Sequence, residues 1–314
     1  MSPGKRSAGS PPAGEARARL AVAGPFDAAW LEAFLAARAV PGLERFEGGE
    51  YVRTLSGSGS SVGIRFAGGS EGRGRGSTLD GAVVTARSFG SLDAGRLVAA
   101  VARLFDLAAP PVGFLAAAAA DPVLAPLASR RPGLRLPIYD DPFEGLVRAI
   151  LGQQVSVAAA RTIGGRLVER FGRPAPPLGG APLRFFPTPE ALAAAGRPAL
   201  RALGLTGAKT ATLQGAADAV ASGRLDLEAL RSAPPDEADA ALRALSGIGP
   251  WTAAYVRLRA LGDRDAFPAG DLGVRKALAG ASGKLPSERD VERRAAAWRP
   301  WRGYATLHLW AGLE

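Results

Sequence analysis

Residues 245–253 read Leu-Ser-Gly-Ile-Gly-Pro-Trp-Thr-Ala and are the most informative segment of the chain. The segments on either side, Ala238–Leu245 and Trp251–Leu261, both have the composition of short helices. A G-x-G turn between two such helices predicts a helix–hairpin–helix, in which glycines let the backbone approach a phosphate and the second helix presents free N–H groups. Pro250 suits the first helical turn because its missing N–H is not needed there. An ordinary helical hairpin with a glycine cap is the alternative.

Asp271 follows Trp251 by twenty residues, at a place where another helix is expected to begin. Aspartate is a common N-cap, since its carboxylate accepts a hydrogen bond from a free backbone N–H of the first turn. The same position would also put a carboxylate at the mouth of a cleft between helices. The two roles are compatible, and the sequence leaves both open.

The composition excludes several kinds of chemistry. The 314 residues include no cysteine and a single histidine, His308. This excludes disulfides, iron–sulfur clusters, thiolate zinc sites and a cysteine nucleophile. We therefore expect no metal site built from side chains. The net charge of +10 favours a polyanionic partner such as nucleic acid, although only four of the 39 basic residues are lysine, which also fits a biased genome.

The N-terminal third divides into a tail and a small α+β domain. Residues 1–19 are polar and basic without the apolar core of a signal peptide, so we expect a disordered tail and a cytoplasmic, nucleoid-associated protein. Residues 20–108 are predicted to combine two helices with three strands. The predicted helices are 27–40 and 92–107, the strands are 51–55, 62–66 and 82–86, and a glycine-rich loop covers 68–76. No stretch is continuously apolar enough to cross a membrane.

From residue 109 the pattern is almost wholly helical, and we expect eight to ten helices in two subdomains, 109–245 and 246–314. One predicted helix begins near Asp141 and ends at Gly152. Two adjacent amides, Gln153 and Gln154, follow it. They suit contact with the polar edges of base pairs. The alternative is an ordinary solvent-exposed turn between two helices.

Two further patterns are ambiguous. Gly204–Thr210 ends like a phosphate-binding loop, but its glycines are too close together for one. We interpret it as a degenerate echo of the hairpin, with Lys209 at the place of Trp251. The segment Trp298–Trp310 holds three of the five tryptophans among arginines. Such a helix is more often core than binding site, although aromatic faces also stack on bases.

Together these segments resemble the helix–hairpin–helix superfamily of DNA glycosylases. The hairpin followed by Asp-Leu-Gly-Val-Arg-Lys at 271–276 resembles the superfamily signature, and the order of the other motifs is most similar to the alkylbase glycosylases of the DNA-3-methyladenine glycosylase II family. Those motifs are Phe34–Val40, Arg103–Leu107, Arg131–Pro137, Val147–Val155 and Trp298–Trp310. The resemblance implies a mainly α fold. An N-terminal α+β domain, similar to half of the TATA-box-binding fold, would precede two helical subdomains that enclose the active cleft.

The resemblance also implies roles for individual residues. Asp271 matches the catalytic carboxylate. The aromatic positions of the base pocket match Trp251, Tyr255 and Trp310. The DNA-binding positions match Gly247, Gly249 and Thr252 in the phosphate clamp, whose carbonyls often bind Na⁺ or K⁺, and Gln154 at the wedge that enters the duplex. The well-known family member has an apolar wedge there.

The resemblance further implies the type of reaction. Bifunctional glycosylases of the superfamily carry a lysine at the position of Trp251, so we expect hydrolysis without strand cleavage. The implied substrates are 3-methyladenine, 7-methylguanine and related bases in double-stranded DNA, removed during base excision repair. We expect a monomer that needs no cofactor beyond the hairpin cation. The alternatives are a glycosylase for oxidised or deaminated bases, and a non-catalytic DNA-binding module in which Asp271 is only a cap.

Overall fold

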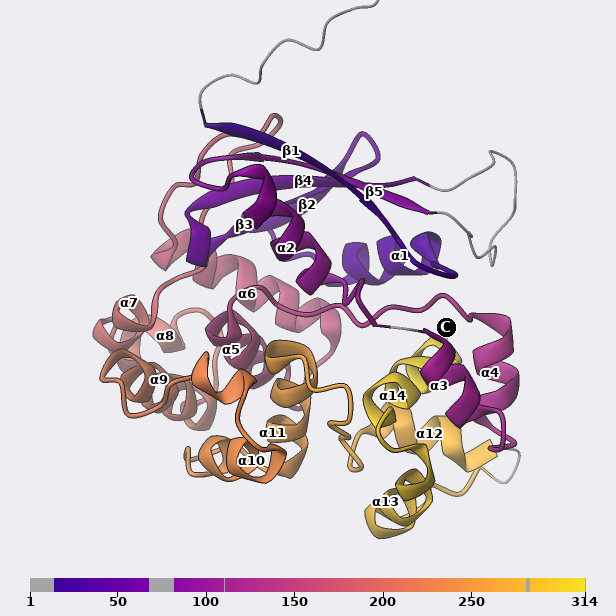
Figure 1. Ribbon diagram of the computed structural model, residues 1–314. Coiled ribbons are helices and arrows are strands. Elements are labelled where there is room, and N and C mark those ends of the chain that lie inside the picture. The colour runs from indigo at the N-terminus through magenta and orange to yellow at the C-terminus, as the bar shows by residue number, and fades with distance from the viewer. Residues whose placement is uncertain (1–13, 68–81, 110, 281–282, 314) are drawn as a thin grey trace, which may run out of the picture.

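The computed structural model describes residues 14–67, 82–109, 111–280 and 283–313, which form an antiparallel sheet beside a helical body (Figure 1). The predicted glycine-rich loop 68–76 lies outside these residues. The sheet has five strands in the order β1-β5-β4-β3-β2. Their bounds are Glu15–Ala21 (β1), Glu44–Glu47 (β2), Glu50–Leu55 (β3), Ser60–Ala67 (β4) and Val83–Phe89 (β5).

The three predicted strands correspond to β3, β4 and β5, and the two edge strands were missed. The prediction of a tail over residues 1–19 is wrong for residues 15–19, which belong to β1. This strand pairs with β5 over its full length, from Glu15 opposite Phe89 to Ala21 opposite Val83. Its alternation of alanine with charged residues is a weak strand signal. Pairing with β5 and the burial of Leu20 stabilise the strand despite this weak local preference.

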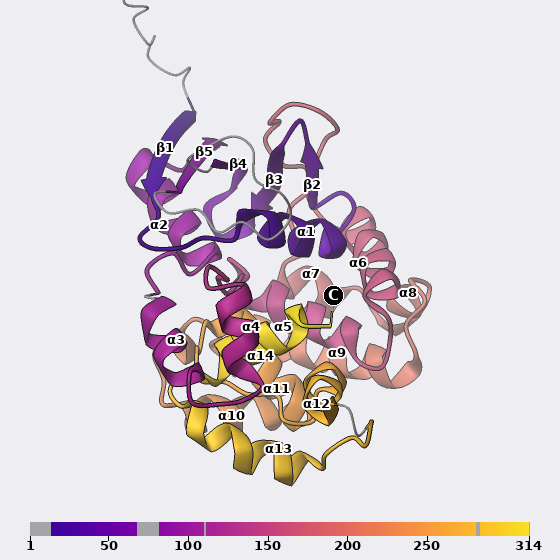
Figure 2. The ribbon, with the colours of Figure 1, turned by 90° about the vertical axis from the view of Figure 1, so that its right-hand side faces the viewer.

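Two helices, α1 (Ala28–Arg38) and α2 (Ala94–Leu104), share an apolar core with the sheet. The carboxylate of Asp27 caps α1 by accepting a hydrogen bond from the Trp30 N–H at 3.0 Å. Figure 2 shows α1 between the sheet and the helical body. The C-terminal end of α1 can therefore contribute to a site formed between the N-terminal domain and the helical body.

The helical body contains more helices than expected. Twelve α-helices follow residue 109 among the described residues, because short helices such as α7 and α8 are separated by single turns. Between these two, Gly196 has a φ of +71°. The twelve are α3 (Pro111–Ala118), α4 (Leu124–Arg130), α5 (Pro142–Gly152), α6 (Val157–Phe171), α7 (Pro189–Ala194), α8 (Arg197–Arg201), α9 (Gly207–Ala221), α10 (Pro235–Arg243), α11 (Pro250–Val256), α12 (Leu272–Ala279), α13 (Glu288–Ala295) and α14 (Arg302–Ala311).

The helices pack in two groups (Figure 1), each with its own apolar core. The first group surrounds α5 and extends from α5 to α11. The second joins α3 and α4 to α12, α13 and α14. The predicted division at 245/246 does not match this packing, because α11 packs on α5 and because α3 and α4 pack on α14. None of the helices in the described part of the chain is long and apolar enough to span a membrane.

Candidate active site

The predicted hairpin is present, formed by α10, the turn 244–249 and α11. Ala244, not a glycine, caps α10, so the glycines serve the turn itself. Gly247 has a φ of +85°, and a Cβ there would overlap the Thr212 hydroxyl of α9. Gly249 has extended backbone and open space around it, and it precedes the free N–H groups of α11. Thr252 is 3% exposed, so its side chain is not available to a phosphate clamp.

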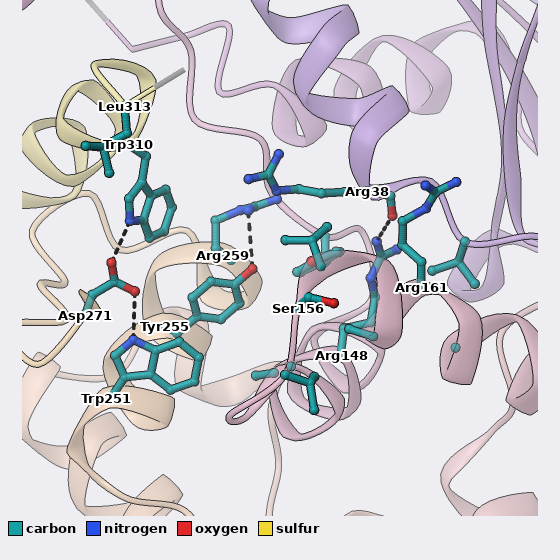
Figure 3. Close-up of a pocket in the computed structure, with 18 residues that line it drawn as sticks. Arg38, Arg148, Ser156, Arg161, Trp251, Tyr255, Arg259, Asp271, Trp310 and Leu313 are labelled. Carbon is teal, nitrogen blue, oxygen red and sulfur yellow. Dashed lines mark hydrogen bonds between the residues drawn. The ribbon is translucent and has the colours of Figure 1, made fainter. Parts of the chain in front are cut away.

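Asp271 has both of the roles that the sequence left open. As the N-cap of α12 it accepts a hydrogen bond on Oδ1 from the Val274 N–H at 3.0 Å. The indole of Trp310 donates to the same oxygen at 2.9 Å. The indole of Trp251 donates to Oδ2 at 3.0 Å. Figure 3 shows the carboxylate held between these two indoles. Three donors from three elements fix its orientation.

Tyr255 completes an aromatic wall beside the carboxylate. Its ring stacks on Trp251 with centroids 5.5 Å apart and an interplanar angle of 26°. Its centroid lies 6.2 Å from that of Trp310. Burial raises the pKa of Tyr255 to about 12, so the phenol is neutral near pH 7. The four residues predicted for the catalytic and base-pocket positions therefore lie together.

A cavity of about 400 Å³ opens in front of this wall. It is lined from α1, α5, α6, α11 and α14, so the N-terminal domain contributes to it as well as both helical groups. Its basic residues, which the sequence did not predict, are Arg38, Arg148, Arg161 and Arg259. No local motif marks them, because Arg38, the pair Arg148 and Arg161 on α5 and α6, and Arg259 come from three separate parts of the chain.

Arg259 is the most enclosed of these arginines. It lies in a π-helical turn, Arg257–Leu261, that continues α11, and it is 3% exposed. Its Nε donates to the Pro137 carbonyl at 2.6 Å. Its guanidinium lies 5.1 Å from the ring centroid of Tyr139. No carboxylate in the described part of the chain lies within ion-pair distance of it. A cationic group therefore faces the same cavity as Asp271.

Arg148 belongs to a buried ion-pair network between the sheet and α5. Its Nη1 lies 2.6 Å from Glu44 of β2 and 3.0 Å from Glu144 of α5. Arg53 of β3 pairs with Glu144 at 2.7 Å. The Nη2 of Arg148 also donates to the Arg38 carbonyl at the end of α1. The network thus holds the N-terminal domain against the helix that forms one side of the cavity.

Gln154, the predicted wedge, lies at the exposed junction of α5 and α6. Its φ of +54° is in the left-handed region. Gln154 does not line the cavity, whereas the next residues, Val155, Ser156 and Val157, do. Val155 and Val157 are 41% and 46% exposed, which puts apolar side chains at the cavity mouth. The side chain of the neighbouring Gln153 hydrogen-bonds to the hairpin, a contact that its position in the sequence does not indicate.

Two family models match the chain. One, described as the AlkA N-terminal domain, matches residues 17–141, and the other, described as the HhH-GPD superfamily base excision DNA repair protein, matches residues 147–302. The DNA-3-methyladenine glycosylase 2 of Escherichia coli is 35% identical over 296 residues, covering 91% of this chain and 94% of that protein. The chain belongs to the DNA-3-methyladenine glycosylase family.

Other relatives agree with this family. A Mycobacterium tuberculosis protein named "Probable bifunctional transcriptional activator/DNA repair enzyme AlkA" is 39% identical over 307 residues, or 96% of this chain. The chain spans only 58% of that relative's length. The solved structure of a 3-methyladenine DNA-glycosylase from Archaeoglobus fulgidus has a TM-score of 0.76 and 26% identity, covering 93% of this chain and 97% of that one. The mainly α fold with an N-terminal α+β domain is thus that of the family.

Proposed function

We propose that the chain is a monofunctional DNA glycosylase that removes alkylated bases from double-stranded DNA in base excision repair. One observation carries the proposal: the carboxylate of Asp271 is fixed by the indoles of Trp251 and Trp310 at the edge of a cavity of about 400 Å³. The chain's membership of the DNA-3-methyladenine glycosylase family supports the substrate class.

The hairpin and the overall charge account for binding. Gly249 leaves room for a phosphate to approach the backbone, whereas Gly247 lets the turn pack against Thr212 of α9. The N–H groups that open α11 attract the phosphate. The net charge of +10 adds nonspecific attraction to the DNA backbone. The damaged nucleotide rotates out of the duplex into the cavity, at an energetic cost that is lowest for a base that already pairs poorly.

The aromatic wall accounts for selectivity. Alkylation at N3 or N7 gives a purine ring positive charge. The faces of Trp251, Tyr255 and Trp310 attract such a ring by about 0.5–2 kcal/mol. Arg259, on the same cavity, repels positive charge and favours acceptor atoms. Because the Arg259 guanidinium lies 5.9 Å from the Tyr255 ring centroid, a cationic base is favoured at the end of the wall formed by Trp251 and Trp310, beside Asp271.

The carboxylate accounts for the chemistry. The glycosidic bond breaks with its electron pair passing to the leaving base, and positive charge develops on the sugar. Asp271 stabilises this charge, and water then adds to the anomeric carbon and releases its extra proton to the surrounding water. Trp251 stands where a Schiff-base mechanism would need an amine, so the strand is left intact.

A base-release assay tests the proposal. Duplexes carrying one 3-methyladenine, 7-methylguanine, 8-oxoguanine or uracil are incubated with the protein, and borohydride is added in parallel. The expected result is release of the alkylated bases only, with no covalent complex trapped. Release of only the oxidised or deaminated base would favour the same-fold alternative. A trapped complex would overturn monofunctional hydrolysis, and binding without any release would favour the non-catalytic module.

Three accessory expectations belong to the same proposal. Hairpin carbonyls would hold a Na⁺ or K⁺ ion, since oxygen donors suit such hard cations. Higher melting temperature in K⁺ than in tetramethylammonium would test this. We also propose a monomer, to be checked by light scattering. Localisation with the nucleoid in the cytoplasm would be checked with a fluorescent fusion.

A further inference from the structure

The junction between α5 and α6 lies against two helical hairpins. The first hairpin is α8–α9, the echo motif of the sequence, and the second is α10–α11, the phosphate clamp. Helix α5 packs on both α9 and α11 (Figure 1). The junction carries Gln154, whose side chain is exposed and makes no hydrogen bond within the described part of the chain.

Gln153 ties this junction to the clamp. Its backbone N–H donates to the Ile150 carbonyl, which closes the last turn of α5. Its side-chain Nε2 donates to the Gly247 carbonyl and to the Thr252 hydroxyl, each at 3.0 Å. Thr252 is buried in α11, so the amide reaches into the base of the clamp. One side chain therefore bridges the turn and the second helix of the hairpin.

Lys209 ties the junction to the other hairpin. It lies in the first turn of α9, whose cap is Thr206. Its Nζ donates to the Leu151 carbonyl at 2.9 Å, next to the end of α5. The same helix α9 supplies Thr212, against which Gly247 packs. The two hairpins thus contact each other, and each holds the end of α5 by one hydrogen-bonded side chain.

Gln154 needs such support because its backbone is in the left-handed region, with a φ of +54°. That conformation is unfavourable for a residue other than glycine, and it persists where the surrounding structure imposes it. The bonds of Gln153 and Lys209 fix the backbone immediately before it.

We propose that Gln153 and Lys209 are positioning residues that hold Gln154 at a fixed offset from the clamped phosphate, so that clamping of the strand brings Gln154 to the base stack. This inference rests on the proposed function. Reactions that depend on alignment lose about a hundredfold in rate for a displacement near 1 Å. Loss of the hydrogen bonds made by either side chain should therefore slow base flipping more than it weakens DNA binding or alters the chemistry at Asp271.

The test compares two tie variants, Gln153→Ala and Lys209→Met, with Gln214→Ala. Each tie variant removes one of the two side chains that hydrogen-bond the junction to a hairpin. Gln214 is a matched control because its Nε2 also donates to a backbone carbonyl, that of Ala193 at 3.3 Å, away from the junction. Single-turnover release of 7-methylguanine is measured at saturating protein. One duplex pairs the damaged base with cytosine, and the other places it opposite an abasic spacer, where flipping costs less.

We expect both tie variants to release the paired base about ten- to a hundredfold more slowly than the parent. On the spacer duplex we expect a defect of less than about threefold. Gln214→Ala should match the parent on both, and Lys209→Arg, which keeps the donor, should restore most of the rate. A fluorescent 2-aminopurine opposite a tetrahydrofuran site reports stack opening without base release, and both tie variants should give a weaker signal there.

Equal slowing on the two duplexes would overturn the positioning role, as would parental rates in both tie variants. Stack opening by the parent with no base release would refute the proposed function while leaving the positioning role to be decided by the 2-aminopurine signal. Neither opening nor release by the parent would overturn both.

Discussion

The carboxylate of Asp271 accepts three hydrogen bonds, and their geometry predicts what an amide would do in its place. In Asp271→Asn the amide oxygen still caps α12 and accepts from Trp310. The NH₂ group then faces the Trp251 indole N–H, donor against donor. We expect a loss of about 1 kcal/mol in the free energy of unfolding and a loss of roughly a hundredfold or more in single-turnover base release.

Urea unfolding and release assays on this variant check the two effects separately, with DNA binding measured on an abasic analogue. Because the change removes charge and not shape, binding should persist. Turnover at the parental rate by a folded Asp271→Asn protein would remove Asp271 from the chemistry and leave it as a cap.

The indole N–H of Trp251 orients Asp271, whereas its ring stacks on Tyr255, and Trp251→Phe separates these contributions. Phenylalanine keeps the aromatic face and loses the 3.0 Å hydrogen bond to Oδ2. We expect base release to slow by about tenfold, equivalent to one hydrogen bond to a charged group. Trp301→Phe, outside the cavity, is the control. An unchanged rate in Trp251→Phe would show that Val274 and Trp310 suffice to orient the carboxylate.

Among the structural elements, the hairpin uses its two glycines for different purposes. A side chain at Gly247 meets Thr212 and a φ of +85°, so Gly247→Ala should cost about 1–3 kcal/mol in the free energy of unfolding. At Gly249 nothing lies within 4 Å of an added Cβ. Gly249→Ala should therefore change stability by at most about 1 kcal/mol yet weaken DNA binding, because the methyl group occupies the phosphate approach. Thermal unfolding and fluorescence anisotropy distinguish the two. Equal binding by Gly249→Ala and the parent would contradict a backbone clamp at that point.

Helix α14 contains a second testable feature, the buried imidazole of His308. It is 2% exposed and stacks on Phe114 with centroids 4.5 Å apart, and its Nδ1 has no hydrogen-bond partner among the residues that the structure describes. Burial lowers the pKa of His308 to about 3, against about 6.5 for an unfolded chain. The unfolded state therefore binds the proton first. The stability that neutral His308 contributes is complete above pH 6.5 and is lost progressively as the pH falls towards 3.

His308→Gln keeps a donor but does not titrate, so its unfolding free energy should fall less steeply below pH 6. The difference in slope should approach about 1.4 kcal/mol per pH unit. Urea unfolding between pH 4 and 8 measures it, and the comparison cancels the contribution of the carboxylates. Parallel curves would mean that His308 is not protected from protonation.

For the molecule as a whole, the sequence predicted what depends on local patterns. The hairpin glycines, the Asp271 cap and the end of α5 at Gly152 were all placed correctly. Strand β1 was missed because its register comes from β5, about 70 residues away in the chain. The meeting of Asp271 with Trp310 was implied by family resemblance and not by spacing.

The basic side of the cavity and the role of Gln153 depend on tertiary packing. Arg38 and Arg259 approach one cavity from helices more than 200 residues apart. Gln153 and Gln154 are chemically identical neighbours. Gln153 has a φ of −58° and its amide contacts the hairpin, whereas Gln154 has a φ of +54° and its side chain is exposed. No periodicity in the sequence carries that information.

In the buried network between the sheet and α5, the carboxylate of Glu144 is shared by two arginines and links the two parts of the molecule. This side chain is 1% exposed and pairs with both Arg53 and Arg148. Glu144→Gln leaves two buried guanidinium groups sharing fewer counter-charges, and breaking a buried pair costs about 3–5 kcal/mol. Glu228→Gln is the matched control: the Glu228 side chain is 67% exposed and pairs only with Arg231 in the described part of the chain, so its loss should cost less than about 1 kcal/mol.

Urea unfolding, monitored by tryptophan fluorescence and by circular dichroism, measures the loss in the free energy of unfolding. Because Arg148 also holds the Arg38 carbonyl at the end of α1, weakening the network should loosen the N-terminal domain from α5 and distort the cavity that they share. We therefore expect Glu144→Gln to lower base release along with stability, whereas Glu228→Gln should lower neither. A stable Glu144→Gln protein with parental release would mean that apolar packing alone holds the two parts together.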